Sequence, residues 1–400
     1  MNKRYWAVAV AALLTAAACT AGPSPTPGPT ATPVATPTPE PTVGEGEGQL
    51  SVLAWPGYVE DGSTDPKVDW VTPFEQETGC QTTVQVFDTS DEAFTLYTTA
   101  PEQFDVVSAS GDASLRLVAG GFVQPVNVDL VPSYTQIFDD LKNKDYNTVD
   151  GVHYGIPHGR GANVLMWRTD LVQPAPTSWS DMFDPSGPYA GKYSVYDAPI
   201  YIADAAVVLM NTKPELNIKH PYALDETQLK AAVDLLKAQK PAVGEYWSSY
   251  TKQIDSFTNG NTVIGTTWQV IANALQGAKV PVPVDVTLPP EGATGWSDTW
   301  MINSKTKNIN CAYKFLDHIT SAEVNIQIAE YFGEAPGNRE SCKLAKNPQH
   351  CATFHAAEPD YWTKVWYWTT PVADCLDGRT DVKCADFAAW VKAWQEIKAS

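Results

Sequence analysis

The segment Leu50-Ser-Val-Leu-Ala-Trp55 decides the fold class, because it starts a repeated order of strand and helix along the chain. It has the apolar composition of a buried strand, as do Thr83-Val-Gln-Val-Phe87 and Phe104-Asp-Val-Val-Ser108. Helix-like stretches separate these strands at residues 70–77 and 91–98. Strands that alternate with helices indicate an α/β protein with a parallel sheet.

The alternation continues toward the C-terminus. Asp225, with Gln228 three residues later, is typical of a capped helix start. Residues 261–267 and 300–303 are predicted strands, and a long helical stretch at residues 308–331 is interrupted near its middle. We therefore expect two α/β lobes joined by crossovers.

Ligands of such proteins bind at the carboxyl ends of the strands. In this chain those ends are Trp55, the stretch from Ser108 to Asp112, and Asp197. These positions are the first candidates for a binding site.

The N-terminus has the order of a secretory signal. Lys3 and Arg4 precede a short apolar run, and three alanines stand before Cys19. The apolar run is too short to span a bilayer as a helix. A Cys in this position resembles the lipid-attachment site of bacterial lipoproteins, although Ala16 replaces the usual Leu. Residues 20–49 are rich in Pro and Thr and read as an extended spacer.

Charge and aromatic content narrow the class of ligand. The net charge is −19, and removal of Lys3 and Arg4 with the signal would make it −21. This sign argues against nucleic acid or anionic lipid as a partner and is compatible with a cationic ligand. The 14 Trp and 17 Tyr residues exceed what core packing usually requires. Exposed rings in a cleft bind sugars by stacking or amines by cation–π contact.

The cysteines predict disulfides rather than a metal site. Six remain when Cys19 is set aside, and an even number in an exported chain indicates disulfide pairing. Fifteen pairings are possible. Two of the possible bridges join cysteines that are close in sequence and would close short polar loops. The two cysteines that remain would then form one long-range bridge. The expected pairs are Cys80–Cys311, Cys342–Cys351 and Cys375–Cys384.

No catalytic motif is present. The sequence has no G-x-S-x-G, H-E-x-x-H or P-loop pattern, and its six His residues are scattered. We expect neither enzymatic activity nor a cofactor or metal. An extracellular glycosidase that uses Trp walls and two acids is the alternative from a different functional class.

Five motifs, in the same order, resemble the spermidine/putrescine-type substrate-binding proteins of bacterial ABC importers. They are Trp55-Pro-Gly-Tyr58-Val, Phe104-Asp-Val-Val-Ser-Ala-Ser110-Gly-Asp112, Tyr154-Gly-Ile-Pro157, Thr177-Ser-Trp179-Ser-Asp181 and Trp296-Ser-Asp298. The resemblance runs over residues 50–338. It implies a two-lobed periplasmic-binding-protein fold of type II, with the ligand cleft between the lobes.

The resemblance also implies a domain order. We expect a signal peptide at 1–18 and the Cys anchor with its linker at 19–49. The first lobe would comprise 50–157 and 299–340, and the second lobe 158–298 together with 341–400. A monomer of this kind would stand outside the cytoplasm on its lipid, capture a small cationic ligand and deliver it to ABC permease subunits.

Site residues follow position by position from the resemblance. It implies aromatic walls, carboxylates at the ligand's ammonium groups and one polar contact. The expected ligand-binding residues are Trp55, Tyr58, Ser110, Asp112, Asp197, Trp268, Trp296, Asp298 and Glu334.

Four positions depart from the pattern. Asp112 stands where the family usually has a ring, Ile200 where it has a second carboxylate, and Glu334 where it has a Tyr. Arg160 is an unexpected cation near a polyamine. We expect it to pair with Asp112 or Asp197, or to bind a ligand carboxylate. The last possibility makes a zwitterion such as 4-aminobutyrate the alternative ligand, and a sugar is less favoured.

The lipid anchor yields a direct prediction. Replacing Cys19 by Ser removes the attachment thiol, so the variant should be retained as a precursor or released into the medium. Metabolic labelling with a fatty-acid probe measures this. Equal labelling of the wild type and Cys19→Ser would show that the lipid is attached elsewhere.

Overall fold

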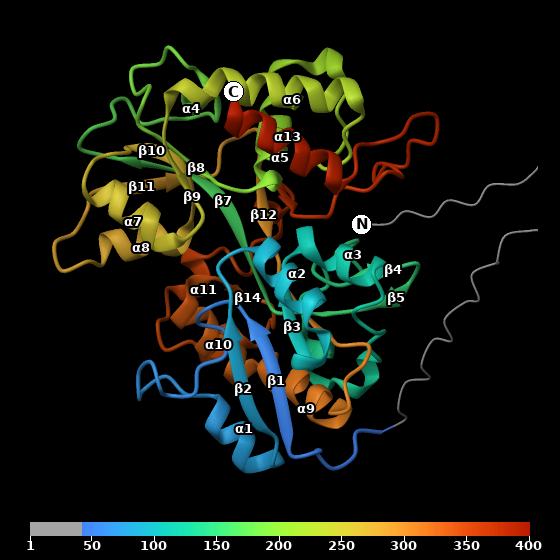
Figure 1. Cartoon of the computed structure of the whole chain (residues 1–400). Coiled ribbons are helices and arrows are strands. Elements are labelled where there is room, and N and C mark those ends of the chain that lie inside the picture. The colour runs from blue at the N-terminus through green and yellow to red at the C-terminus, as the bar shows by residue number, and fades with distance from the viewer. Residues whose placement is uncertain (1–41) are drawn as a thin grey trace, which may run out of the picture. The chain divides into compact units, whose positions relative to one another are not determined.

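The computed structural model describes residues 42–400 of the chain. The expected signal peptide, Cys19 and most of the linker lie outside the described residues. Two β-sheets organise the described part, and Figure 1 shows their strands and the helices around them. None of the helices within residues 42–400 combines the length and apolarity needed to span a bilayer.

The first sheet has five strands in the order β2-β1-β3-β13-β6. Their bounds are β2 Gln81–Val86, β1 Gln49–Ala54, β3 Val106–Ala109, β13 Thr299–Ile302 and β6 Ile156–Pro157. The helices that belong to this lobe are α1 Val71–Thr78, α2 Ser90–Thr99, α3 Gly111–Ala119 and α9 Ile309–Ile319. Strands β1 and β3 form one continuous buried core with these helices, as their apolar runs predicted.

The second sheet has eight strands. Its main path is β15-β12-β7-β10-β8-β9, and β11 and β14 pair with β7. The bounds are β7 Gly159–Arg168, β8 Tyr193–Tyr196, β9 Val243–Trp247, β10 Ile264–Trp268, β11 Val284–Thr287, β12 Ala293–Trp296, β14 Ala335–Pro336 and β15 Val365–Tyr367. A separate hairpin pairs β4 Thr148–Val149 with β5 Val152–His153.

The helices around the second sheet include one that is buried along most of its length. Eight of the eleven residues of α5 Ile202–Thr212 are buried, which matches its almost uniformly apolar sequence. The remaining helices of this lobe are α4 Ser180–Phe183, α6 Glu226–Gln239, α7 Tyr250–Thr258, α8 Gln269–Gln276, α11 His350–Thr353, α12 Pro359–Trp362 and α13 Phe387–Ala399. Helix α10 Ala322–Ile328 instead packs into the core of the first lobe through Val324 and Ile328.

Local sequence signals are confirmed at two helices. Asp225 and Gln228 form the expected reciprocal capping box at the start of α6. The helical stretch at 308–331 is broken after α9, and Ser321 caps α10 by accepting from Val324 N. It ends in one π-helical turn at Gly333, whose φ of 90° favours glycine.

The expected parallel sheet is found only in part, because both large sheets also contain antiparallel pairs. Strands β1, β2 and β3 are parallel, but β13 runs antiparallel to β3, and β7 runs antiparallel to β10 and β12. The reason is that β6 and β7, and likewise β12 and β13, are consecutive strands that belong to different sheets. A strand that arrives from the other lobe, such as β7 or β13, therefore runs antiparallel to the strands beside it.

Three chain segments cross between the two sheets close to one another. The first crosses at His158, between β6 and β7, and the second at Asp298, between β12 and β13. Their backbones are joined by a hydrogen bond of 2.9 Å from His158 N to Asp298 O. The third runs through Glu334 into β14, and Gly337 N donates to His158 O at 3.0 Å.

The C-terminal segment is part of the second sheet's core. Strand β15 pairs with β12. Helix α13 packs against α6, as Figure 1 shows. Trp390, Trp394 and Ile397 of α13 are buried in the same cluster as α5.

The structure contains all three disulfides expected from the sequence. Cys80–Cys311 links residues 231 positions apart, whereas Cys342–Cys351 and Cys375–Cys384 each span 9. The long bridge joins the start of β2 to α9 and therefore ties an early element of the first lobe to a late one.

These loop sizes predict a difference in stability. Chain-entropy arguments assign about 5 kcal/mol to a bridge as long as Cys80–Cys311 and about 3 kcal/mol to one that closes a loop of about ten residues. The double variant Cys80→Ala/Cys311→Ala should therefore lower the free energy of unfolding by about 2 kcal/mol more than Cys342→Ala/Cys351→Ala. Urea titration of both variants measures this. Equal losses would show that loop entropy does not set the contribution of the long bridge.

Candidate functional site

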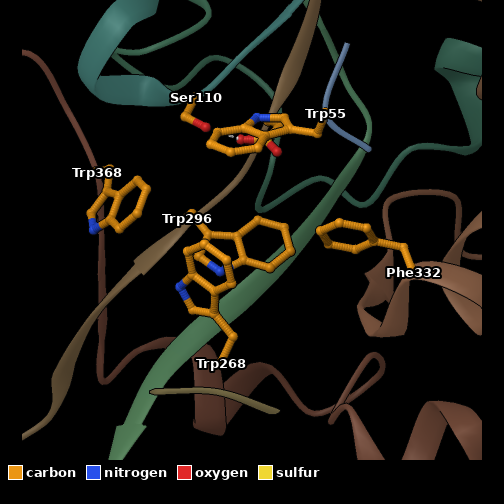
Figure 2. A pocket seen from close by; sticks show the side chains of 7 residues that line it. Trp55, Ser110, Trp268, Trp296, Phe332 and Trp368 are labelled. Carbon is orange, nitrogen blue, oxygen red and sulfur yellow. Dashed lines mark hydrogen bonds between the residues drawn. The ribbon is translucent and has the colours of Figure 1, made fainter. Parts of the chain in front are cut away.

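A small cavity lies where the two sheets meet. Its walls come from both lobes, and Figure 2 shows most of its residues as aromatic rings that surround a central space. The lining residues are Trp55, Ser110, Trp268, Trp296, Asp298, Phe332 and Trp368. The enclosed volume is about 20 Å³, which is room for about one water molecule. The lobes must therefore separate to admit a larger ligand.

Among residues 42–400, Asp298 is the only carboxylate that lines this cavity. It lies on the crossing segment between β12 and β13, and its side chain is held on both oxygens. Ser110 Oγ donates to Oδ1 at 2.5 Å, and Tyr58 Oη donates to Oδ2 at 2.7 Å. Because Ser110 follows β3 and Tyr58 follows β1, the first lobe fixes the orientation of this carboxylate.

A second carboxylate is buried behind the first. Tyr58 Oη is also 3.2 Å from Glu334 Oε2, and His158 Nε2 is 3.2 Å from Glu334 Oε1. Trp300 Nε1 donates to His158 Nδ1 at 2.9 Å. Nδ1 is thus an acceptor, which leaves the ring proton on Nε2, facing Glu334. The three crossing segments contribute Asp298, Glu334 and His158 to this one network.

Burial shifts the acid–base properties of the network. It raises the pKa of Asp298 to about 6, although the hydrogen bonds from Ser110 and Tyr58 oppose this shift. Burial also raises the pKa of Tyr58 well above its usual value, and the charges of Asp298 and Glu334 add to that effect. Asp298 can therefore attract a cation at neutral pH, and a carboxylate with little water around it gains from doing so.

The Trp side chains are positioned by strand ends and by a glycine. Trp268 and Trp296 end β10 and β12, and their ring centroids are 6.4 Å apart. A Cβ atom on Gly161 would stand 2.4 Å from the Trp296 ring, so only glycine allows β7 to approach that ring. Trp55 directly follows β1 and packs on Phe87.

Two lining residues were missed by sequence reasoning. Phe332 lies in the π-helical turn, with its ring edge-on to Trp296. Trp368 follows β15, donates from its backbone N to Gly295 O at 2.6 Å, and stacks on Tyr196. The aromatic run Val365-Trp-Tyr-Trp368 was a usable signal, but nothing local to it indicated that the C-terminal segment returns to the site.

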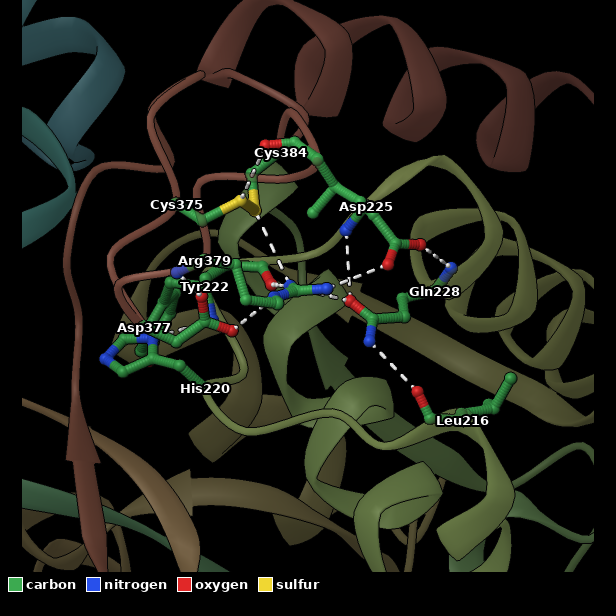
Figure 3. Close-up of polar contacts among 11 residues, drawn as sticks. Leu216, His220, Tyr222, Asp225, Gln228, Cys375, Asp377, Arg379 and Cys384 are labelled. Carbon is green, nitrogen blue, oxygen red and sulfur yellow. Dashed lines mark hydrogen bonds and ion pairs between the residues drawn. A yellow bond between two sulfur atoms is a disulfide. The ribbon is translucent and has the colours of Figure 1, made fainter.

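The segment that follows Trp368 is fastened to the second lobe. Figure 3 shows the loop closed by Cys375–Cys384, with Arg379 at its centre. Arg379 donates to Asp225 at 2.9 Å, to Gln228 at 3.1 Å and to the backbone oxygen of Ala223 at 2.6 Å. This loop is therefore attached to the capped start of α6, and Trp368 is held between that anchor and β12.

Four of the expected binding residues do not line the cavity. Tyr58 and Glu334 lie behind Asp298, in the buried network described above. Asp112 is buried in the first turn of α3, where burial and then the charge of Asp91 raise its pKa to about 7. Asp197 lies outside the cavity, where Lys398 Nζ donates to it at 2.9 Å.

Arg160 corrects a further expectation. It pairs with neither Asp112 nor Asp197 but with Asp140, at 2.5 Å. Its guanidinium lies 4.2 Å from the ring centroid of Trp362 and donates to the backbone oxygen of Ala356 at 3.0 Å. Within residues 42–400, no Arg lines the cavity of Asp298, and Arg160 lines a neighbouring cavity that shares Trp296 with it.

Three more cavities among the described residues adjoin the first. One shares Trp296 with it and is lined by Arg160. The other two share Trp268 and Phe332 with it. The larger encloses about 490 Å³ and includes Glu60, Tyr250 and Tyr331. The smaller includes Asp88. Among residues 42–400, neither Lys nor Arg lines the inner cavity or the two cavities that share Trp268 with it. Within residues 42–400, no group of three His, Cys, Asp or Glu side chains could hold a metal ion.

Comparison with known proteins identifies a matching family. The family model described as bacterial extracellular solute-binding protein matches residues 69–356, which is most of the chain. The spermidine/putrescine-binding periplasmic protein of Escherichia coli (strain K12) is 24% identical over 292 residues, covering 72% of this chain and 78% of that protein.

Solved structures show the same fold at low sequence identity. The substrate-binding protein PotD of a spermidine/putrescine ABC transporter from Streptococcus pneumoniae superposes with a TM-score of 0.67 and 18% identity, over 88% of this chain and 97% of the other. The Atu4243 GABA receptor gives a TM-score of 0.61 and 21% identity, over 87% and 95%. The fold is thus the two-lobed α/β fold of periplasmic binding proteins.

The raised pKa of Asp298 predicts a stabilising substitution. Its folded value of about 6 exceeds the value of about 3.9 in unfolded chains, so the folded state binds this proton more tightly. Stability should fall as pH rises from about 4 to about 6, and the ionised group should cost up to about 3 kcal/mol above that range. Asp298→Asn removes this cost.

The variant should therefore melt at a higher temperature than the wild type at pH 7.5, without ligand, and the difference should shrink at pH 4. Calorimetry at both pH values measures it. A lower melting temperature for Asp298→Asn at pH 7.5 would contradict the raised pKa.

Proposed function

Because the chain belongs to the bacterial extracellular solute-binding proteins, we propose that it captures a small organic cation of the polyamine class and delivers it to an ABC permease. Members of this family work outside the cytoplasm. The observation that carries the proposal is Asp298, a desolvated carboxylate among aromatic rings with no Lys or Arg on the cavity walls.

The physical argument concerns the balance of charge in a closed cleft. A ligand ammonium that leaves water needs an anionic partner, and its methylene groups need apolar or ring surfaces. Asp298 and the Trp rings supply both. The adjoining cavities extend the acidic, aromatic surface outward through Glu60, Asp88 and Tyr250, where the rest of an extended amine would lie.

Two alternatives receive less support. A zwitterion such as 4-aminobutyrate needs a cation for its carboxylate, and Arg160 is engaged with Asp140 outside the cavity. Glycoside hydrolysis uses two carboxyl groups that flank the sugar. The inner cavity offers only Asp298, because Glu334 lies behind Tyr58.

The proposal includes a mode of action. The ligand would bind between separated lobes, which then close on it by bending at the three crossing segments. The protein would remain a monomer, performing no chemistry and held to the membrane by a lipid on Cys19. Closure would bring Trp55 and Ser110 of the first lobe against Trp268 and Trp296 of the second.

Titration calorimetry with putrescine, spermidine and 4-aminobutyrate tests the ligand class. Asp298→Asn should weaken binding of the preferred amine by about 30- to 1000-fold, because loss of the carboxylate leaves a desolvated cation without its partner. Asp197→Asn is the matched control and should change affinity by less than about threefold, since Asp197 lies outside the cavity. Binding of a neutral sugar without any binding of these amines would contradict the proposal.

A further inference from the structure

The inner cavity surrounds one carboxylate with five aromatic rings, those of Trp55, Trp268, Trp296, Phe332 and Trp368. Figure 2 shows them on several sides of a common centre, with the indole nitrogens of Trp55 and Trp368 on ring edges turned away from it. The rings come from both lobes and from the C-terminal segment, so they form a cage when the lobes are together.

The cage offers few hydrogen-bond acceptors. Its lining residues include one carboxylate and one hydroxyl. Asp298 accepts one hydrogen bond on each oxygen, from Ser110 and Tyr58, which leaves one lone pair on each oxygen, and Ser110 gives its only proton to Asp298. A primary ammonium brings three N–H donors that all need acceptors. Each donor left unpaired in a buried site weakens binding by roughly tenfold or more.

Two positions at which the family resemblance implies a carboxylate do not supply a free one to the cage. Ile200 is buried in the second lobe's core, and Asp197 accepts from Lys398. Among the described residues that line the cage, the polar side chains are those of Asp298 and Ser110, which are in contact with each other, so they offer acceptors to a primary ammonium in one place while its three N–H donors point in three directions. The cage nevertheless retains a negative charge. A methylated ammonium matches this cage, because it carries a positive charge but few or no N–H donors. Its methyl groups can contact the ring faces by cation–π attraction.

We propose that this cavity selects an ammonium group that carries methyl groups over a primary ammonium. The inference rests on the proposed function, since it assigns the same cavity to the ligand's cationic end. It narrows the substrate class to N-methylated or quaternary amines, with the remainder of the molecule directed toward Trp268 and the larger cavity.

Two matched pairs of probes test the selection by calorimetry on the wild-type protein. The first pair is putrescine and (4-aminobutyl)trimethylammonium, which differ only in methylation of one end. The second is choline and 3,3-dimethylbutan-1-ol, which share a shape but differ in charge. The methylated putrescine should bind at least about tenfold more tightly than putrescine, and choline at least about tenfold more tightly than its neutral analogue.

The outcomes separate a failure of this inference from a failure of the proposed function. If putrescine binds as tightly as its methylated form or more so, the inference is overturned and the proposed function stands. If choline and the neutral alcohol bind equally, apolar fit rather than the cationic cage sets the affinity, and the inference fails. If none of the amines binds, the proposed function fails with it.

A pair of variants locates the selectivity in the rings. Trp268 is partly exposed at the end of β10, so its replacement disturbs the core less than that of Trp296. Trp268→Leu should remove most of the preference for the methylated probe, whereas Trp268→Phe, which keeps a ring, should retain it. Melting temperatures check that both variants are folded. An unchanged preference in Trp268→Leu would show that this ring is not part of the selecting cage.

Discussion

The buried network of Asp298, Tyr58, Glu334 and His158 is the constraint on which the rest of this structure depends. Each of the three segments that pass between the lobes contributes one titratable side chain to it. Tyr58 joins the two carboxyl groups through a single hydroxyl. The lobes therefore cannot move without affecting the groups that orient Asp298, and Asp298 cannot change its charge without affecting the crossing segments.

The buried, ionised Asp298 lowers the stability of the unliganded protein, whereas it would strengthen the binding of a cation. A carboxylate buried among rings is expensive to ionise, and it becomes favourable only when a cation compensates for it. Apolar packing in the two cores, one in each lobe, must carry that cost in the unliganded protein. In the proposed function, the same desolvation would make the carboxylate selective for a cationic ligand, because a neutral ligand cannot offset its charge.

The C-terminal segment, although distant in sequence from the other lining residues, forms part of the cavity wall. It pairs β15 with β12, places Trp368 against the cavity and then continues into a loop fastened by Cys375–Cys384 and Arg379. Thr370 N also donates to Gly111 O of the first lobe, at 3.0 Å. This segment thus contacts both lobes beside the cavity, in addition to the three crossings.

Local sequence determined the strand and helix order, the capped start of α6 and the break before α10, because each depends on near neighbours. The predicted strand ends indicated Trp55 and Ser110. The family resemblance, rather than any local pattern, indicated Trp268, Trp296 and Asp298. Tertiary structure decided the rest. Asp197 forms an ion pair with Lys398, 201 residues away, and Arg160 forms one with Asp140. Trp368 and Phe332, which the sequence did not indicate, line the cavity. Such long-range partners depend on how the crossings orient the lobes, and no local pattern of charge or apolarity encodes that orientation.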